Sequence, residues 1–322
     1  MEIETTGPRE TERGEMMTKP KIGLALGSGG ARGWCHIGVL RALAEEGIEP
    51  TIIAGCSMGA LVGATYVAGA LDTLEEFARS LDWRKIAGYL DVHPVKGGLI
   101  EGTRIVELLR TLKQDASIES FPKAFTAIAS DLGTGREIWL QSGSMVDAVR
   151  ASIAIPGIIS PLKLNGRWLL DGGMTNPVPV SACRAMGADI VIAVNANAGA
   201  FRPHPLRITD PARTDSEPLT RDISDRVFAS APDGIGRAFK AIAPEFLSAK
   251  SDAPGYFNVL STSIDIMTSH ILRSRLAGEP PHVMINAQLS HLRVLEFQRA
   301  SEAIEEGRQR TKQAIGLIRE YL

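Results

Sequence analysis

The pattern in this sequence with the clearest chemical meaning is Gly55-Cys56-Ser57-Met58-Gly59, a G-x-S-x-G arrangement. In many hydrolases this arrangement places a nucleophilic serine on a sharp turn between a strand and a helix. Small residues are needed on both sides of such a turn, because larger side chains would collide with the neighbouring backbone. Gly55 and Gly59 meet that need, so Ser57 is the candidate nucleophile. The competing interpretation is a glycine-bordered helix start that Ser57 merely caps.

A serine nucleophile is usually activated by a histidine base, but no histidine of this sequence has a suitable context. The six histidines are His36, His93, His204, His270, His282 and His291. We expect a surface or core-edge position for each of them. Cys56 is not expected to act either, since a turn of this kind directs the neighbouring side chains away from the site. The base must therefore be a residue of another type.

The best candidate for the base is Asp171 in GRWLLDGGMTNPVPV, where a predicted strand delivers a carboxylate into a Gly172-Gly173 turn. An aspartate in water has a pKa of about 3.9 and accepts a hydroxyl proton poorly. Burial beside the serine would raise that pKa toward working pH, so a Ser-Asp dyad is chemically feasible. Asp171 can instead be a structural turn residue, a common use of Asp-Gly. We expect this turn role for Asp131 in ASDLGTG.

A third feature is the run SGGARG at residues 28–33, which we expect at the start of a helix. Attack on an ester carbonyl creates an oxyanion, and backbone N–H groups at a glycine-rich helix start can hold it. The run matches the dinucleotide fingerprint G-x-G-x-x-G poorly, and no GK[ST] follows it as in a P-loop. Arg32 has two open interpretations: it neutralises a substrate phosphate, or it pairs with a nearby acidic residue.

Strands and helices alternate around these motifs, which predicts an α/β fold with a largely parallel sheet. Strands are expected at 21–27, 51–55, 125–130, 137–141, 168–170, 189–195 and 283–286. Helices are expected from the glycine-rich run to Gly47 and at 60–70, 74–90, 103–112 and 296–322. One strand precedes the strand that ends at the serine, whereas the general α/β-hydrolase fold places several strands before its nucleophile.

The same patterns divide the chain into four parts. Residues 1–20 are expected to be a disordered tail, 21–197 the catalytic core, 198–255 an insertion or lid-like excursion, and 256–322 the C-terminal part of the same domain. The apolar residues at helical spacing within the excursion are Ile235, Phe239, Ile242 and Phe246. Their shared face either packs on the core or forms a lipid-contacting lid over the Ser57 cleft.

The composition is that of an ordinary soluble globular protein, with 44% hydrophobic and 22% charged residues. A formal charge of -2 and a pI near 6.3 show no basic excess, so nucleic acid is not an expected partner. The three cysteines lie far apart and are expected to be reduced thiols in the cytoplasm. The N-terminus lacks the apolar core of a secretory signal, and the most apolar segment is too short to span a bilayer.

Three motifs follow one another in a fixed order along the chain: GSGGARGWCHIGVL, then GCSMG, then DGG. Together with ASIAIPGIISPL before the aspartate and NPVPV after it, they closely resemble the patatin-like phospholipase family, particularly its compact bacterial members. The resemblance runs from about Ile22 to Asn195 and resumes in IMTSHILRSRLAGEPPHVMI. One difference is Ser28, since the family's glycine motif often begins with glycine at that position.

This resemblance implies a three-layer α/β/α sandwich with a mostly parallel central sheet, and a catalytic dyad of Ser57 and Asp171. It also implies an oxyanion hole formed by Gly29 and Gly30, with Arg32. The implied activity is hydrolysis of acyl esters of phospholipids and other lipids, of the phospholipase A or lysophospholipase type, without a metal or other cofactor. The expected partner is a lipid or ester substrate, with peripheral contact to a membrane. The sequence leaves the oligomeric state open.

Two other functions are compatible with the same motifs. An acyltransferase would pass the acyl group from the serine to an alcohol or thiol in place of water. A non-catalytic lipid-binding regulator would keep the fold, and loss of Ser57 or Asp171 would be its expected sign. Both residues are present in this chain.

Overall fold

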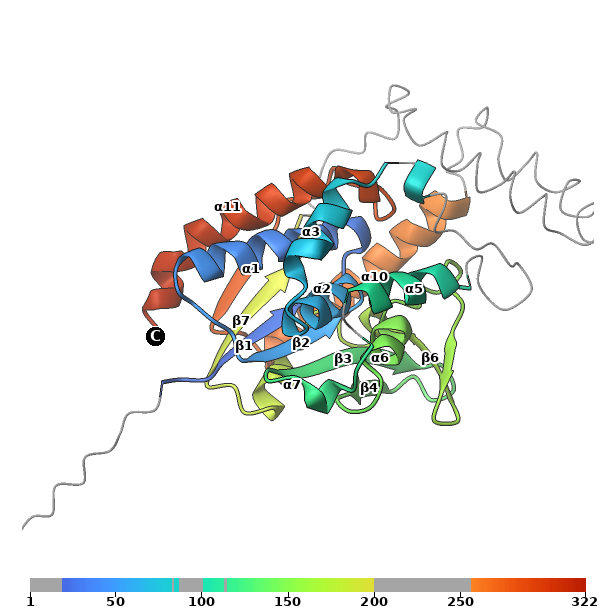
Figure 1. Ribbon diagram of the computed structural model, residues 1–322, viewed down its shortest axis with the longest axis horizontal. Coiled ribbons are helices and arrows are strands. Elements are labelled where there is room, and N and C mark those ends of the chain that lie inside the picture. Colours follow the sequence, from blue (N-terminus) through green and yellow to red (C-terminus); the bar gives the residue numbers. More distant parts are fainter. Residues whose placement is uncertain (1–18, 83, 87–100, 113–114, 200–255) are drawn as a thin grey trace, which may run out of the picture.

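The structure is a computed structural model that describes residues 19–82, 84–86, 101–112, 115–199 and 256–322 (Figure 1). Residues 1–18 of the predicted tail and residues 200–255 of the predicted excursion lie outside this part of the chain. The apolar face predicted between Ile235 and Phe246, as well as His93 and His204, therefore also lie outside it.

An eight-stranded sheet forms the middle of the fold, in the order β5-β6-β3-β2-β1-β7-β8, with β4 paired to β3. The strands are β1 (Ile22–Leu26), β2 (Ile52–Cys56), β3 (Ala124–Asp131), β4 (Glu137–Leu140), β5 (Leu162–Leu164), β6 (Arg167–Asp171), β7 (Ile190–Asn195) and β8 (Val283–Asn286). The β3-β2-β1-β7-β8 part is parallel, whereas β4, β5 and β6 pair antiparallel. Each predicted strand is present with ends shifted by at most one residue, and only the short β5 was not predicted.

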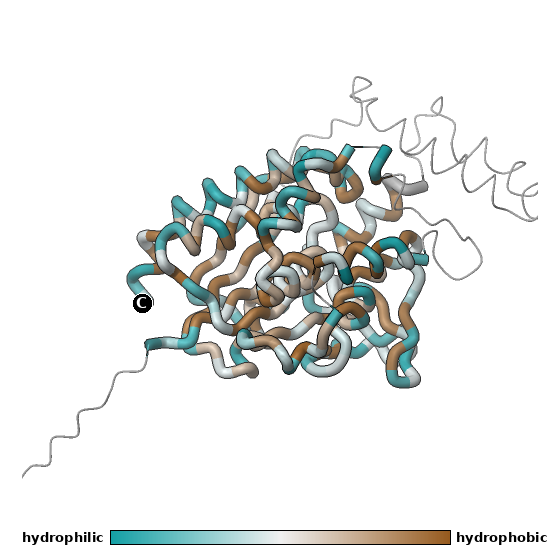
Figure 2. Tube along the Cα trace, in the orientation of Figure 1, coloured by the Kyte–Doolittle hydropathy of each residue, from teal (hydrophilic) through white to brown (hydrophobic). Residues whose placement is uncertain are grey.

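The central strands are apolar throughout because both of their faces are covered. In β1, Leu24 and Leu26 point into one hydrophobic core, while Ala25 points into a second core on the opposite face. Successive strand residues point to opposite sides of a sheet, so a strand between two helical layers needs apolar residues at every position. Figure 2 shows hydrophobic residues concentrated along these strands and hydrophilic residues on the outer sides of the helices.

Helices cover both faces of the sheet, which confirms the predicted three-layer α/β/α sandwich (Figure 1). One layer contains α1 (Cys35–Glu45), α2 (Met58–Val67), α3 (Leu71–Arg79), α5 (Thr103–Thr111), α6 (Met145–Ser152) and α11 (Ala300–Arg319). The other contains α7 (Val180–Ala185) and α10 (Tyr256–Gly278). Short 3-10 helices occur at η1 (Gly30–Trp34), η2 (Ile118–Ser120), η3 (Gly172–Met174) and η4 (Phe297–Arg299).

Two helix predictions were wrong in their extent. The helix predicted over 74–90 ends at Arg79, and a new turn begins where the Asp82 carboxylate accepts the Lys85 N–H at 2.8 Å. Asp is a favoured N-cap residue, and capping here starts a second helix in place of continuing the first. The helix predicted from Glu296 begins at Ala300, after the 3-10 turn η4.

The last helix completes the layer that contains α1. A Cβ on Gly38 of α1 would lie 1.8 Å from the Ile304 carbonyl oxygen, and one on Gly307 would lie 2.0 Å from that of Cys35. The two helices therefore cross with their backbones in contact, which only glycine allows. No helix within the described ranges combines the length and apolar composition that crossing a bilayer requires.

Candidate active site

Ser57 lies on the sharp turn between β2 and α2, as the G-x-S-x-G pattern predicts. Its φ of 55° lies in the left-handed region, which is rare for a residue with a side chain and is common at functional sites. A Cβ on Gly55 would lie 2.5 Å from Ala60 Cα, and one on Gly59 would lie 2.1 Å from the Leu26 carbonyl oxygen. The strained turn can form only because both of these positions are glycine.

The hydroxyl of Ser57 donates a hydrogen bond to the carboxylate of Asp171, with 2.5 Å between Oγ and Oδ2. Both residues are buried, with 3% and 4% of their surface exposed. Strand β3 brings them together, because Cys56 pairs with its residue Ile128 and Asp171 pairs with the next one, Ala129. The structure thus places the predicted nucleophile and the predicted base in direct contact.

Asp171 occupies the end of β6, where the chain enters η3. Its second carboxylate oxygen accepts the Gly173 N–H at 2.7 Å, and its own N–H donates to the Ala154 carbonyl at 2.9 Å. Burial raises the pKa of Asp171 to about 6, against the opposing effect of the hydrogen bonds from Ser57 and Gly173. The carboxylate is therefore a stronger base than an aspartate in water, yet it is still ionised at neutral pH.

Ser152, at the end of α6, is a site residue that the sequence reasoning did not single out. Its hydroxyl oxygen accepts the backbone N–H of Ser57 at 2.9 Å, and its side chain is completely buried. This contact ties the strained turn to the end of α6. The only available sequence signal was its place in ASIAIPGIISPL, one of the segments that resemble the family.

The glycine-rich run forms the turn between β1 and η1, and most of its backbone groups are occupied. The Ser28 N–H donates to the Pro177 carbonyl and the Ala31 N–H to that of Val294, both at 2.8 Å. Among the described residues, the N–H groups of Gly29 and Gly30 have no acceptor. Both glycines line the same cavity as Ser57 and Asp171.

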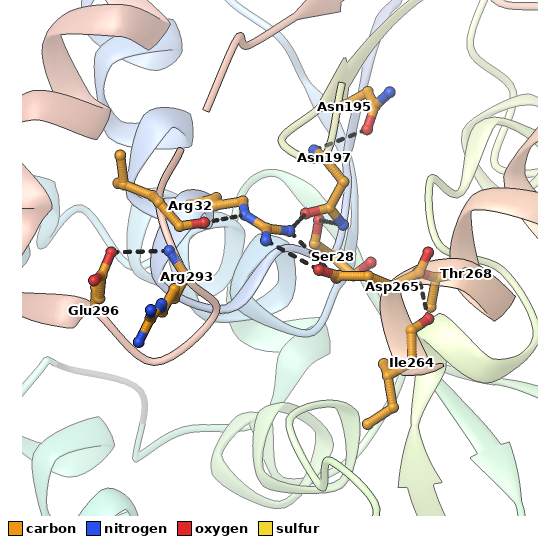
Figure 3. Close-up of polar contacts among 10 residues, drawn as sticks. Ser28, Arg32, Asn195, Asn197, Ile264, Asp265, Thr268, Arg293 and Glu296 are labelled. Atoms are coloured by element: carbon orange, nitrogen blue, oxygen red, sulfur yellow. Dashed lines mark hydrogen bonds and ion pairs between the residues drawn. The ribbon is translucent and has the colours of Figure 1, made fainter. Parts of the chain in front are cut away.

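Arg32 was predicted to form the oxyanion hole together with Gly29 and Gly30, but its contacts in the structure are with other groups. Its N–H donates to the Gly29 carbonyl at 3.1 Å, and it is not among the residues that line the Ser57 cavity. Its guanidinium forms a two-point ion pair with Asp265 of α10, at 3.0 and 3.2 Å, and also donates to Asn197 Oδ1 and the Leu292 carbonyl (Figure 3). Of the two interpretations left open by the sequence, pairing with an acidic residue is the one observed.

The cavity at Ser57 has a volume of about 40 Å³ and is lined by apolar and polar residues. The apolar lining residues are Ile155, Pro156, Ile158, Met174, Ile264 and Val294. Such a space holds only a few non-hydrogen atoms. It therefore accommodates an ester group, while the remainder of a larger substrate must extend beyond it.

No described histidine lines this cavity. His36 lies in the core and not at its edge or the surface: it is fully buried, and its Nε2 donates to the Gly27 carbonyl at 2.7 Å. Burial lowers the pKa of His36 to about 4, so the ring is neutral. Cys56 is also buried, with its pKa raised well above the ordinary value by desolvation. Asp131 accepts the Gly133 N–H at 2.9 Å, which confirms the predicted turn role.

A three-layer sandwich with a buried serine on a strand-to-helix turn defines the class of this protein as an ester hydrolase. The model of the family described as patatin-like phospholipase matches residues 24–184. The chain belongs to this family, which confirms the resemblance seen in its motifs.

Several curated proteins are similar to this chain. NTE family proteins of Mycobacterium bovis and Mycobacterium tuberculosis are 37% identical over 334 residues, covering 92% of this chain and 92% of each relative. The lysophospholipase nte1 of Aspergillus fumigatus is 32% identical over 189 residues, covering 54% of this chain and 12% of that protein. A crystal structure of VipD from Legionella pneumophila has a TM-score of 0.47 and 14% identity, covering 93% of this chain and 67% of that one.

Proposed function

We propose that this protein hydrolyses acyl esters of lipids through an acyl-enzyme on Ser57, with Asp171 as the general base. The observation that carries the proposal is the buried hydrogen bond from Ser57 Oγ to Asp171 Oδ2. A nucleophile and a base within hydrogen-bond reach, next to unused N–H groups, meet the geometric requirements of acyl transfer.

In the first half of the reaction, Ser57 Oγ attacks the ester carbonyl carbon while its proton passes to Asp171. The carbonyl oxygen becomes an oxyanion, which the N–H groups of Gly29 and Gly30 stabilise. Collapse of this intermediate breaks the bond to the alcohol oxygen. The leaving alkoxide takes the proton from Asp171, and the acyl group remains on Ser57.

In the second half, water attacks the acyl-enzyme and gives a proton to Asp171. The same two N–H groups hold the second oxyanion. When the bond to Ser57 breaks, the proton returns to Oγ and the fatty acid leaves. Asp171 can play both parts because its pKa of about 6 lies close to neutral pH.

A lipid ester of the phospholipase A or lysophospholipase type is the proposed substrate. The apolar residues at the Ser57 cavity, among them Ile155 and Ile158, suit the start of an acyl chain, and one relative that matches this chain is named a lysophospholipase. We propose a cytoplasmic protein that contacts lipid surfaces peripherally. Val259, Ile266 and Met267 support this contact, because they are 43% to 48% exposed on α10, the helix that borders the site.

Labelling with a fluorophosphonate probe tests the nucleophile, and a panel of lysophospholipid, diacyl phospholipid and monoacylglycerol tests the substrate class. We expect the wild-type protein and the control Ser142→Ala, an exposed serine, to be labelled and to release free fatty acid. Ser57→Ala should lose both activities while keeping the fold, because only the attacking oxygen is removed. Normal turnover by Ser57→Ala would refute the mechanism, and an acyl product other than free acid would identify an acyltransferase.

A further inference from the structure

A second cavity, of about 270 Å³, adjoins the small one at Ser57. The two cavities share Ser28, Asn197 and Thr268 as lining residues. The second cavity lies between the end of β7, the glycine-rich turn and α10. Because the Ser57 cavity has room for little more than an ester group, the larger space is the nearest place for another part of the substrate.

The lining of the second cavity contains polar as well as apolar residues. Its polar lining residues are Ser28, Asn195, Asn197, Thr268, Ser269 and Arg273. Half of the lining residues are therefore hydroxyl, amide or guanidinium side chains, and no carboxylate is among them. Among the described residues, most of these groups are already hydrogen-bonded within the protein, whereas the Ser28 hydroxyl has no partner and the Arg273 guanidinium donates to Ser269 Oγ.

Arg273 gives this cavity a positive charge. Its guanidinium donates to Ser269 Oγ at 3.2 Å, and no carboxylate of the described residues pairs with it. The nearby arginine of the same helix differs, because Arg275 forms an ion pair with Glu137 at 2.6 Å. Arg273 is thus the α10 arginine whose charge is open to an anionic ligand, and Arg275 is not.

Ser28 offers a hydroxyl at the boundary between the two cavities. Its carbonyl accepts from Asn197 Nδ2 (Figure 3). Its backbone N–H donates to the Pro177 carbonyl, and the two bonds fix its position. The Ser28 hydroxyl has no hydrogen-bond partner among the described residues, and it lies 3.4 Å from the place that a Cβ on Gly173 would occupy. This hydroxyl beside the Asp171 turn lines both cavities and is placed to bind an oxygen of the alcohol part of an ester.

We propose that the second cavity binds the alcohol part of a phosphate-bearing lipid ester, with Arg273 contacting the phosphate and Ser28 a hydroxyl or ester oxygen. The acyl chain then extends from Ser57 past the apolar side chains of Ile155, Ile158 and Ile264. This inference rests on the proposed function and adds the orientation and head-group class of its substrate. The Arg273 guanidinium and the Ser28 hydroxyl match the polar end of such a molecule, and the isoleucines of the Ser57 cavity match its acyl end.

Kinetics with three esters of one fatty acid test this proposal: octanoyl glycerol phosphate, octanoyl glycerol and methyl octanoate, each below its aggregation concentration. For each protein we compare kcat/KM for octanoyl glycerol phosphate with kcat/KM for octanoyl glycerol. Arg273→Gln should lower the ratio of these two values about tenfold, because the variant loses one charge-assisted contact to the phosphate. Ser269→Phe, which narrows the cavity, should lower kcat/KM for both glycerol esters far more than for methyl octanoate.

Arg319→Gln is the matched control, because Arg319 is an exposed arginine on α11 that pairs with Glu46 and lines neither cavity. It should leave all three rates and their ratios at wild-type values. Fluorophosphonate labelling of Ser57 at the wild-type rate shows that each variant is folded. An unchanged phosphate ratio in Arg273→Gln, or an equal loss on all three esters in a normally labelled Ser269→Phe, overturns the inference while the proposed function stands. If the wild-type protein neither labels at Ser57 nor hydrolyses any ester, the proposed function fails and this inference fails with it.

Discussion

Arg32 and Asp265 form a partly buried two-point ion pair although 233 residues separate them in the chain. Their side chains are 6% and 14% exposed, and the pair joins the glycine-rich turn to α10. Two charges removed from water depend on each other, because either one alone would be buried without compensation. The position of the glycine-rich turn at Ser57 is thereby linked to the helix that lines both cavities.

Removing one partner of this pair should destabilise the protein strongly. We expect Asp265→Ala to lower the free energy of unfolding by about 3 to 5 kcal/mol, as measured by urea denaturation. The double variant Arg32→Met/Asp265→Leu should recover much of that loss, because no charge is left buried. Asp72→Ala is the control: Asp72 pairs with Arg41 at the surface and is 84% exposed, so we expect a change of at most about 1 kcal/mol. A double variant as unstable as the single one would contradict this account.

Ionisation of Asp171 should set the acidic limit of activity. Because only the carboxylate accepts the Ser57 proton, kcat/KM on a soluble ester should fall about tenfold per pH unit below a pKa of about 6. Asp171→Asn should lose most turnover at neutral pH, and its residual rate should lack this dependence. A pH-rate profile of both proteins provides the measurement. If the acidic limit persisted in the asparagine variant, another group would be the base.

The same carboxylate should make stability depend on pH. Burial raises the Asp171 pKa from the ordinary 3.8 to about 6, so the native state binds this proton more tightly than the unfolded state. The resulting stabilisation is complete below pH 3.8 and is lost as the pH rises through about 6. This loss amounts to about 3 kcal/mol, from the free energy that corresponds to the change in pKa.

Asp171→Asn has no such titration, because an amide stays neutral at every pH concerned. The free energy of unfolding of this variant, relative to that of wild type, should therefore increase as the pH rises from about 4.5 to about 7.5. Most of the change in this relative stability occurs within that pH interval. Denaturant unfolding of both proteins at these two pH values gives the comparison. A stability difference that does not change with pH would show that Asp171 has an ordinary pKa in the folded state.

Gly59 should tolerate no side chain. A Cβ at this position would lie 2.1 Å from the Leu26 carbonyl oxygen, so Gly59→Ala must displace the Ser57 turn or the end of β1. We expect a loss of fluorophosphonate labelling together with a lower melting temperature. The control is Gly316→Ala in α11, where nothing lies within 4 Å of the added methyl group and alanine favours the helix. Normal labelling of Gly59→Ala would show that the turn is less constrained than this geometry indicates.

The local features of this protein could be predicted from the sequence because they depend on neighbouring residues. The apolar strands, the turn at Ser57 and the order of the motifs all follow from short segments, and they were enough to identify the α/β/α sandwich and its family. The two wrong helix ends also have local causes, a capping Asp82 and a 3-10 turn before Ala300. The apolar residues keep a helical spacing across both of these helix ends, so periodicity alone did not reveal them.

The partners of the site residues were decided by the tertiary structure. The sequence predicted Ser57 and Asp171 as a dyad, but their contact depends on β3, which pairs with the ends of both strands and brings together residues 114 positions apart. Nothing in the residues around Ser152 or Arg32 identifies the Ser57 N–H and Asp265 as the groups that they contact. Such long-range contacts are determined by the packing of whole elements and by the need to pair buried polar groups. The spacing of nearby residues in the sequence predicts neither of these two effects.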